Sequence, residues 1–193
     1  MPETGNCTGI SHRSTKSLKN KYEALRQFSR ETAHEELPAV LTNKKGQGIL
    51  KSTLTFSGID VNCINELRKW EMSGSRRVAW DWDKMLKIYR PEPKRFEIAI
   101  WHNKHWLCSA SIGKTTSQGG KLRLDLIESN PNGTILVGLV VDINIISYEA
   151  YARAIGATEL RIVSPVNDAV KNYYLSKKGF SYNKKEDFCF MEI

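Results

Sequence analysis

Residues 150–183 read AYARAIGATELRIVSPVNDAVKNYYLSKKGFSYN, and this stretch decides the fold. Gly156 is expected to end a helix, because glycine most easily takes the left-handed conformation that closes one. Alternating apolar residues predict a strand over 159–164, and Asn167 precedes a second predicted helix over 168–177. The stretch therefore predicts helix, strand and helix in succession, and we expect parallel strand pairing only where such a helix crosses between strands.

The rest of the chain predicts further helices and strands on both sides of this stretch. A loop over 129–133 is followed by a long predicted helix that ends at Ile155, because its apolar residues recur at helical spacing. Other helices are predicted over 18–34, 62–72 and 82–89, and strands over 51–56, 96–101, 105–112, 121–128, 180–183 and 188–192.

This order of elements predicts an α/β (α+β) fold with a mixed, mostly antiparallel central sheet flanked by helices. Residues 1–17 are rich in Thr, Ser, Gly and Asn, so we expect a disordered leader there. Residues 18–48 are expected to form an N-terminal helical extension. The main domain is predicted over 49–193.

The composition is typical of a soluble globular protein, since 40% of the 193 residues are apolar and 26% are charged. No run approaches the ~18 apolar residues that cross a bilayer, and the polar N-terminus has no apolar stretch of a secretory signal. We therefore expect a cytoplasmic protein that makes no membrane contact. The cysteines are far apart and form no CxxC pair, which predicts reduced thiols and no metal site: Cys7, Cys63, Cys108 and Cys189.

The positive charge lies mainly in the middle of the chain. The net charge is +8, and residues 61–123 carry 13 Lys and Arg against 6 Asp and Glu, whereas residues 124–193 carry 7 against 9. A basic patch raises the local concentration of anionic partners. A solvated basic face without a partner is an equal alternative.

A string of residues in the carboxy-terminal third carries a family resemblance. Its members are Ala152, Gly156, the strand 160–163, Asn167, Tyr174 and Gly179-Phe180. In this order they resemble the GNAT (general N-acetyltransferase) superfamily, with residue matches over 121–183 and agreement of element order alone over 50–120. The resemblance implies an N-acyltransferase with acetyl-CoA as cosubstrate and no metal, in which an amine attacks the thioester directly.

The resemblance also implies where coenzyme A binds. Its diphosphate would lie at a helix start, where backbone N–H groups are free, and its thioester against the strand before that loop. The implied cofactor residues are Leu126, Ile127, Asn132, Gly133, Thr134, Gly138 and Asn167. The loop departs from the family pattern, because Leu136 stands where a glycine is usual and Gly133 where a basic residue or glutamine is usual. Alternatively, Gly133 only makes a turn, Gly138 packs on the sheet and Asn167 caps a helix.

For catalysis, the resemblance implies Tyr174 as the acid that protonates the leaving thiolate. A phenol with a pKa near ~10 can donate to a thiolate whose conjugate acid is near ~8.5. The neighbouring Tyr173 is a rival, and a packed aromatic is the other alternative. Glu128 or Asp125 could accept the proton of the amine, directly or through water, although a salt bridge at the strand end is the favoured alternative for both residues.

The acceptor is expected to bind near Arg76, Arg77, Trp80 and Trp82, because aromatic rings among cations can stack on bases or bind acidic groups. Both tryptophans could instead belong to the core. The acceptor amine is left open between protein, nucleic acid and small molecule, as is the oligomeric state. The alternative function is a catalytically silent GNAT-like module that binds nucleic acid or another anion through Arg76, Arg77, Lys94 and Arg95.

Overall fold

The computed structural model describes residues 9–177 and 179–193. Helix α1, Gly9–Glu36, begins well before the predicted start at Leu18, so residues 9–17 are helical rather than part of a leader. The rest of the predicted leader, residues 1–8 with Cys7, lies outside the described residues.

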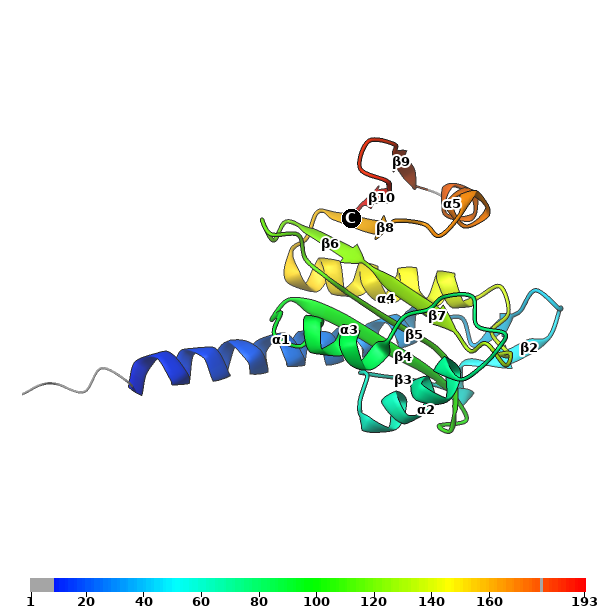
Figure 1. Ribbon diagram of the computed structural model, residues 1–193, viewed down its shortest axis with the longest axis horizontal. Coiled ribbons are helices and arrows are strands. Elements are labelled where there is room, and N and C mark those ends of the chain that lie inside the picture. Colours follow the sequence, from blue (N-terminus) through cyan, green and yellow to red (C-terminus); the bar gives the residue numbers. More distant parts are fainter. Residues whose placement is uncertain (1–8, 178) are drawn as a thin grey trace, which may run out of the picture.

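The described elements form two four-stranded sheets, a small hairpin and the helices that cover them (Figure 1). After α1 they are β1 (Val40–Thr42), β2 (Gly48–Leu50), a 3-10 turn (Lys51–Thr53), β3 (Leu54–Ser57), α2 (Val61–Glu71), α3 (Trp82–Tyr89), β4 (Arg95–His102), β5 (Trp106–Lys114), β6 (Lys121–Leu124), β7 (Leu126–Ser129), α4 (Val140–Ile155), β8 (Glu159–Val163), α5 (Asp168–Leu175), β9 (Ser181–Asn183) and β10 (Phe188–Glu192). The strand orders are β3-β4-β5-β7 and β6-β8-β10-β9. Among the described strands only β6 and β8 pair in parallel, across α4, which confirms the predicted mixed, mostly antiparallel fold.

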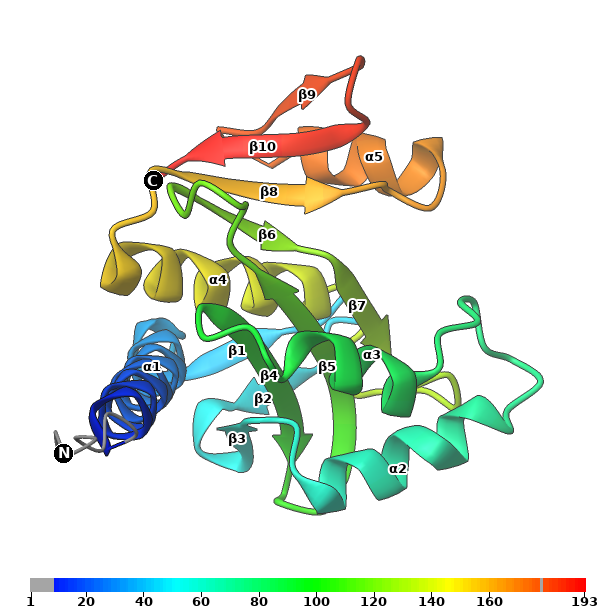
Figure 2. The same cartoon turned by 60° about the vertical axis from the view of Figure 1, so that its left-hand side comes forward.

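Helices cover both faces of the β3-β4-β5-β7 sheet (Figure 2). Successive residues of a strand point to opposite faces, and in β4 Phe96, Ile98 and Ile100 pack in the core that includes α4. Ala99 and Trp101 belong to a second core, formed with α2 and α3. No helix in the described part of the chain is long and apolar enough to cross a membrane.

The predicted strand 121–128 is divided at Asp125 into β6 and β7, which belong to different sheets. Gly113 of β5 explains how the chain can pass from one sheet to the other at this point. An ideal Cβ at this glycine would lie 1.9 Å from the carbonyl oxygen of Arg123, so only a residue without a side chain allows β6 so close to β5. Beyond Asp125, β7 continues beside β5, and the two sheets separate.

Helices α2, α4 and α5 each have an end that differs from the predicted one. Helix α4 begins at Val140, because the preceding residues form a turn in which Gly138 has a φ of 82°. Asp60, not Asn62, caps α2, and its side chain accepts a hydrogen bond from the Cys63 amide. Helix α5 ends at Leu175, two residues earlier than expected.

The N-terminal extension packs into the main core. Leu37, Leu41 and Ile49 are buried in the same cluster as α4. Two arginines of α1 are buried as well: Arg26 donates to the carbonyl of Pro93 (2.9 Å) and Arg30 to that of Glu97 (3.0 Å). Helix α1 is therefore bound to the start of β4 by charged donors as well as by apolar contact.

The described cysteines Cys63, Cys108 and Cys189 are free and buried, as predicted for reduced thiols. Burial raises the pKa of the Cys108 thiol, so it remains protonated near neutral pH.

Candidate active site

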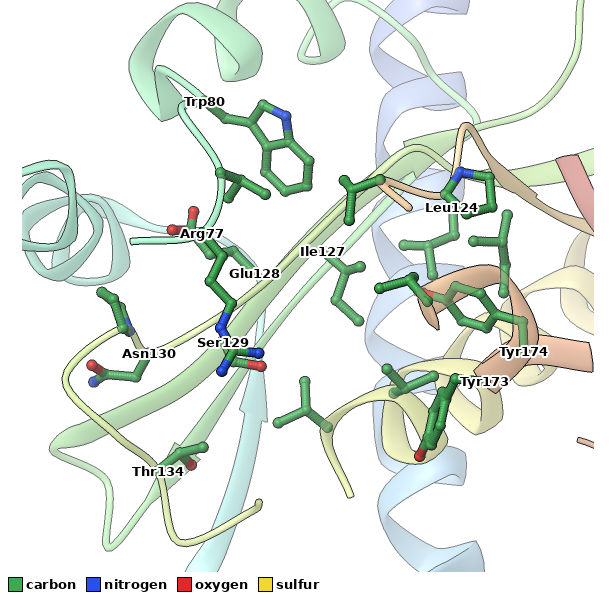
Figure 3. A pocket seen from close by; sticks show the side chains of 18 of the residues that line it. Arg77, Trp80, Leu124, Ile127, Glu128, Ser129, Asn130, Thr134, Tyr173 and Tyr174 are labelled. Atoms are coloured by element: carbon green, nitrogen blue, oxygen red, sulfur yellow. The ribbon is translucent and has the colours of Figure 1, made fainter. Parts of the chain in front are cut away.

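A cavity of about 560 Å³ opens between β7 and β8, where the two sheets separate (Figure 3). We call its two sides the β7 wall and the β8 wall. The β7 wall comprises lining residues of the segments 75–80 and 125–129; the β8 wall comprises those of 162–166 and 170–174 with Val140 and Val141 at the start of α4. Lining residues of the loop 130–138 close one end.

Strand β7 presents backbone donors to this cavity. It is the edge strand of its sheet and pairs with β5 on one side only, for example Ile127 with Ser111. In an antiparallel edge strand, alternate amides point away from the neighbour. The open edge therefore leaves alternate amides of β7 unpaired on the side of the cavity.

The loop after β7 is held by side-chain and backbone bonds. Asn130 donates from its side chain to the carbonyl of Leu107 (2.8 Å), and its amide donates to that of Cys108 (2.9 Å). Gly133, with a φ of 104°, and Gly138 both line the cavity, as does Thr134. No side chain caps α4 at Leu139, so N–H groups of its first turn have no intrahelical or side-chain acceptor.

Tyr174 projects from α5 into the cavity, with its hydroxyl directed toward Ile127 (Figure 3). It is only 2% exposed, and burial raises the pKa of its hydroxyl well above the ordinary range. The hydroxyl is therefore protonated at physiological pH. The rival Tyr173 also lines the cavity, but its hydroxyl is directed away from Ile127 and donates to the carbonyl of Gly138 (3.2 Å) (Figure 3).

Glu128 lines the cavity, but its carboxylate is bound by two side chains. Arg76 donates to both oxygens, at 2.6 and 2.9 Å, and the indole of Trp82 donates to Oε2 at 2.7 Å. The hydrogen bond to Glu128 raises the pKa of Arg76. These contacts bind the segment between α2 and α3 to β7. The Arg76–Glu128 ion pair is the salt bridge at the strand end that was expected as the alternative to a catalytic role.

Asp125, at the division between β6 and β7, is bound in a similar way. Its carboxylate pairs with Arg123 (2.6 Å) and accepts a hydrogen bond from the hydroxyl of Tyr89 (2.8 Å). Burial and the nearby Asp125 carboxylate raise the pKa of Tyr89, so this hydroxyl remains a donor. Asp125 therefore lines the cavity with both carboxylate oxygens bound by side chains.

The expected acceptor residues divide into two pairs. Arg77 and Trp80 line the cavity, and Arg77 extends along β7 toward Ser129 (Figure 3). Arg76 and Trp82 lie behind this wall, and Trp82 is fully buried in the core with α2. The core alternative therefore holds for Trp82, whereas Trp80 is half-buried at the cavity.

Three expected cofactor residues lie outside the cavity lining. Leu126 packs against the core under α2 and α3. Asn132 accepts a hydrogen bond from the Ser73 hydroxyl (2.9 Å), and Asn167 caps α5 by accepting from the Val170 amide (2.9 Å). Their side chains have structural partners in this structure.

The sequence did not predict that two further segments lie at or near the cavity. Ser164, Pro165 and Val166 follow β8 and line its wall. The tip of the β1–β2 hairpin contacts the loop before α4, since the Lys44 amide donates to the carbonyl of Val137 (2.9 Å). Only the first segment could have been found from the sequence, because it follows the carboxyl end of a predicted strand, where ligands bind in open sheets.

Solved structures of N-acetyltransferases match this fold, as expected from the GNAT resemblance. The solved structures that share it include a variant of the spermidine N-acetyltransferase SpeG from Vibrio cholerae (10% identity, TM-score 0.53, 74% of this chain and 94% of that one). Ard1 from Thermoplasma volcanium matches with 12% identity and a TM-score of 0.53, over 73% of this chain and 98% of that one. An acetyltransferase from Streptococcus agalactiae matches with 10% identity and a TM-score of 0.54, over 73% of this chain and 99% of that one. No protein-family model and no curated protein matches the sequence. At such low identity the likeness shows the fold.

Proposed function

We propose that this protein is an N-acyltransferase that moves an acyl group, acetyl in the simplest case, from coenzyme A to an amine. One observation carries the proposal: the cavity between β7 and β8 has an open strand edge on one side and the Tyr174 hydroxyl on the other. A thioester between them would have its carbonyl at the strand amides and its sulfur near a proton donor.

The proposed reaction uses these groups in turn. The amide of Ile127, which points away from β5, donates to the thioester carbonyl and stabilises the negative charge that develops on its oxygen. The neutral amine attacks the carbonyl carbon, a C–N bond forms and the C–S bond breaks. Tyr174 transfers its proton to the departing thiolate, and the diphosphate is held at Gly133, Thr134 and Gly138 before α4.

The amine has to lose a proton, and the cavity offers Asp125 and Glu128 to receive it. Asp125 is bound in an ion pair with Arg123 and Glu128 in one with Arg76, so neither carboxylate is free to receive the proton directly. We therefore propose transfer through water, with Glu128 acting mainly as a positioning residue. On this account the rate rises with pH as the neutral fraction of the amine increases.

The charges at the cavity favour an acceptor that carries an anionic group besides its amine. Both carboxylates that line the cavity are paired with arginines, whereas the exposed Arg77 makes no ion pair with any described residue. A polyamine would bring further positive charge beside Arg77. An amine on a carboxylate- or phosphate-bearing molecule matches this wall better.

The structure supports a silent nucleic-acid-binding module less well. Of the four cations considered for it, Arg76 is bound to Glu128, and Arg95 pairs with Glu97 (3.1 Å). Only Arg77 and Lys94 remain for such a surface, and a small number of phosphate contacts gives weak binding at physiological salt.

Thermal unfolding with and without ligands tests the proposal. We expect acetyl-CoA at a hundred times its Kd to stabilise the fold by about 2.7 kcal/mol, and an RNA or DNA oligonucleotide to have no effect. Stabilisation by the oligonucleotide alone would instead establish the binding module. Incubation of a cell extract with the protein and isotope-labelled acetyl-CoA, followed by mass spectrometry, then identifies the acceptor.

A further inference from the structure

The loop that would hold the coenzyme diphosphate contains no basic residue. Residues 129–139 read SNPNGTILVGL, and the first turn of α4 adds the acidic Asp142. Coenzyme A carries a diphosphate and a further phosphate on its ribose, so several negative charges would meet only backbone amides. Cations from another part of the chain would strengthen such a site considerably.

The hairpin between β1 and β2 is fastened to this loop at its tip. The Lys44 amide donates to the carbonyl of Val137 (2.9 Å), and the side chain of Asn43 donates to that of Ile135 (2.8 Å). Asn43 is only 4% exposed, and its oxygen accepts hydrogen bonds from the amides of Lys45 (2.9 Å) and Gln47 (3.0 Å). The tip and the loop therefore have a fixed relative position.

Lys44 passes directly beside Gly138, which lines the cavity. An ideal Cβ on Gly138 would lie 2.9 Å from Cβ and 3.7 Å from Cγ of Lys44. The side chains of Lys44 and Lys45 are exposed, and neither makes an ion pair with a described residue. The ammonium group of Lys44 or Lys45 can therefore bind an anion beside the loop 129–139, which has no charged side chain of its own.

We infer that Lys44 is a phosphate ligand of the coenzyme, so that the N-terminal extension completes the cofactor site. The inference rests on the proposed function, because it assigns a group to the coenzyme that the proposed reaction uses. It also gives the hairpin a role: Asn43 anchors its backbone to the loop, and Gly138 leaves room for the lysine stem. A positive charge beside Gly138 would bind phosphate and leave the thioester end of the cavity unchanged.

Binding measurements on the full-length chain test this inference by titration calorimetry with acetyl-CoA. We expect Lys44→Ala to raise the Kd about tenfold, as for the loss of one charge-assisted contact, and Lys44→Arg to remain within about twofold of the wild type. Lys87→Ala is the matched control: it removes the same charge from an exposed position on α3 and should leave the Kd unchanged.

A second ligand separates the phosphate end from the thioester end. S-acetylpantetheine has no phosphate, so its binding, followed by NMR titration, should be the same for the wild type and Lys44→Ala. If the wild type binds acetyl-CoA and Lys44→Ala binds it equally well, the inference is wrong and the proposed function stands. If the wild type binds neither thioester, the proposed function fails, and the inference fails with it.

Discussion

The two walls of the cavity are stabilised by different forces. The β7 wall is held by ion pairs, since Arg76 binds Glu128 and Arg123 binds Asp125, each at 2.6 Å. The β8 wall is largely apolar, and Tyr174 supplies its buried hydroxyl. The comparison indicates a division of roles: the polar wall fixes the direction of backbone and side-chain donors, whereas the apolar wall keeps one acid protonated.

The separation of the walls depends on the close approach of β6 to β5 at Gly113. Because an added Cβ would lie 1.9 Å from the Arg123 carbonyl oxygen, we expect Gly113→Ala to lower the free energy of unfolding by more than about 3 kcal/mol. Urea denaturation measures this loss. Gly120→Ala is the control, since no atom lies within 4 Å of its ideal Cβ. Equal stability of the two variants would refute this explanation of the divided strand.

The ion pair of the β7 wall gives the next largest effect. Glu128→Leu leaves Arg76 nearly buried without a partner, so we expect a loss of about 3 kcal/mol in the free energy of unfolding. Adding Arg76→Leu should restore part of this loss, because the unpaired charge is then removed. Denaturant melts of the two single variants and the double variant measure the coupling. Additive losses would show that the pair does not hold this wall.

The acid of the β8 wall should affect rate rather than stability. We expect Tyr174→Phe to lower kcat about a hundredfold, or about 2.7 kcal/mol, with little change in the Kd for acetyl-CoA. Tyr173→Phe is the matched control and should lower kcat less than about threefold, because that hydroxyl donates to the carbonyl of Gly138 and is not directed toward Ile127. A Tyr174→Phe enzyme with wild-type kcat would remove the residue from the mechanism.

The two walls also differ in how far the sequence predicts them. Helix, strand and helix of the β8 wall follow one another in the chain, and their end signals are local: Gly156 takes the left-handed conformation and Asn167 caps α5. Local signals of this kind can be read from spacing, and Tyr174 does lie in the cavity as expected. Its chemical role remains a prediction.

The β7 wall depends on contacts between distant residues, which periodicity does not reveal. The alternating pattern continues through Asp125, so the division into β6 and β7 is visible only from the contact between Gly113 and Arg123. Leu136 is spaced like a residue of the helix, but it lies in the preceding turn, where its side chain is buried. The predicted helix therefore began before the observed start of α4 at Val140. The pairing of Arg76 with Glu128 likewise joins separate elements, as does the contact of the β1–β2 hairpin with the loop before α4.

The smallest effect concerns the start of β8, outside the cavity lining, where the Glu159 carboxylate joins β8 to β6 through Lys121 (3.0 Å). Burial alone would raise its pKa, but hydrogen bonds from Arg161 and Lys121 hold the pKa of Glu159 below its ordinary value of 4.5. A lowered folded-state pKa contributes stability above pH 4.5, and this contribution is lost as the pH falls through the folded-state value.

Glu159→Gln should therefore unfold about 0.5–1 kcal/mol more easily than the wild type at pH 7, since Lys121 is partly exposed and solvent screens the pair. The difference should shrink as the pH falls below about 4.5, where the wild-type carboxylate is protonated as well. Urea melts at pH 7 and pH 3 measure both values. A difference that persists unchanged at pH 3 would mean that packing, and not charge, joins the start of β8 to β6. Ion pairs would then stabilise the β7 wall but not the strand that carries the β8 wall.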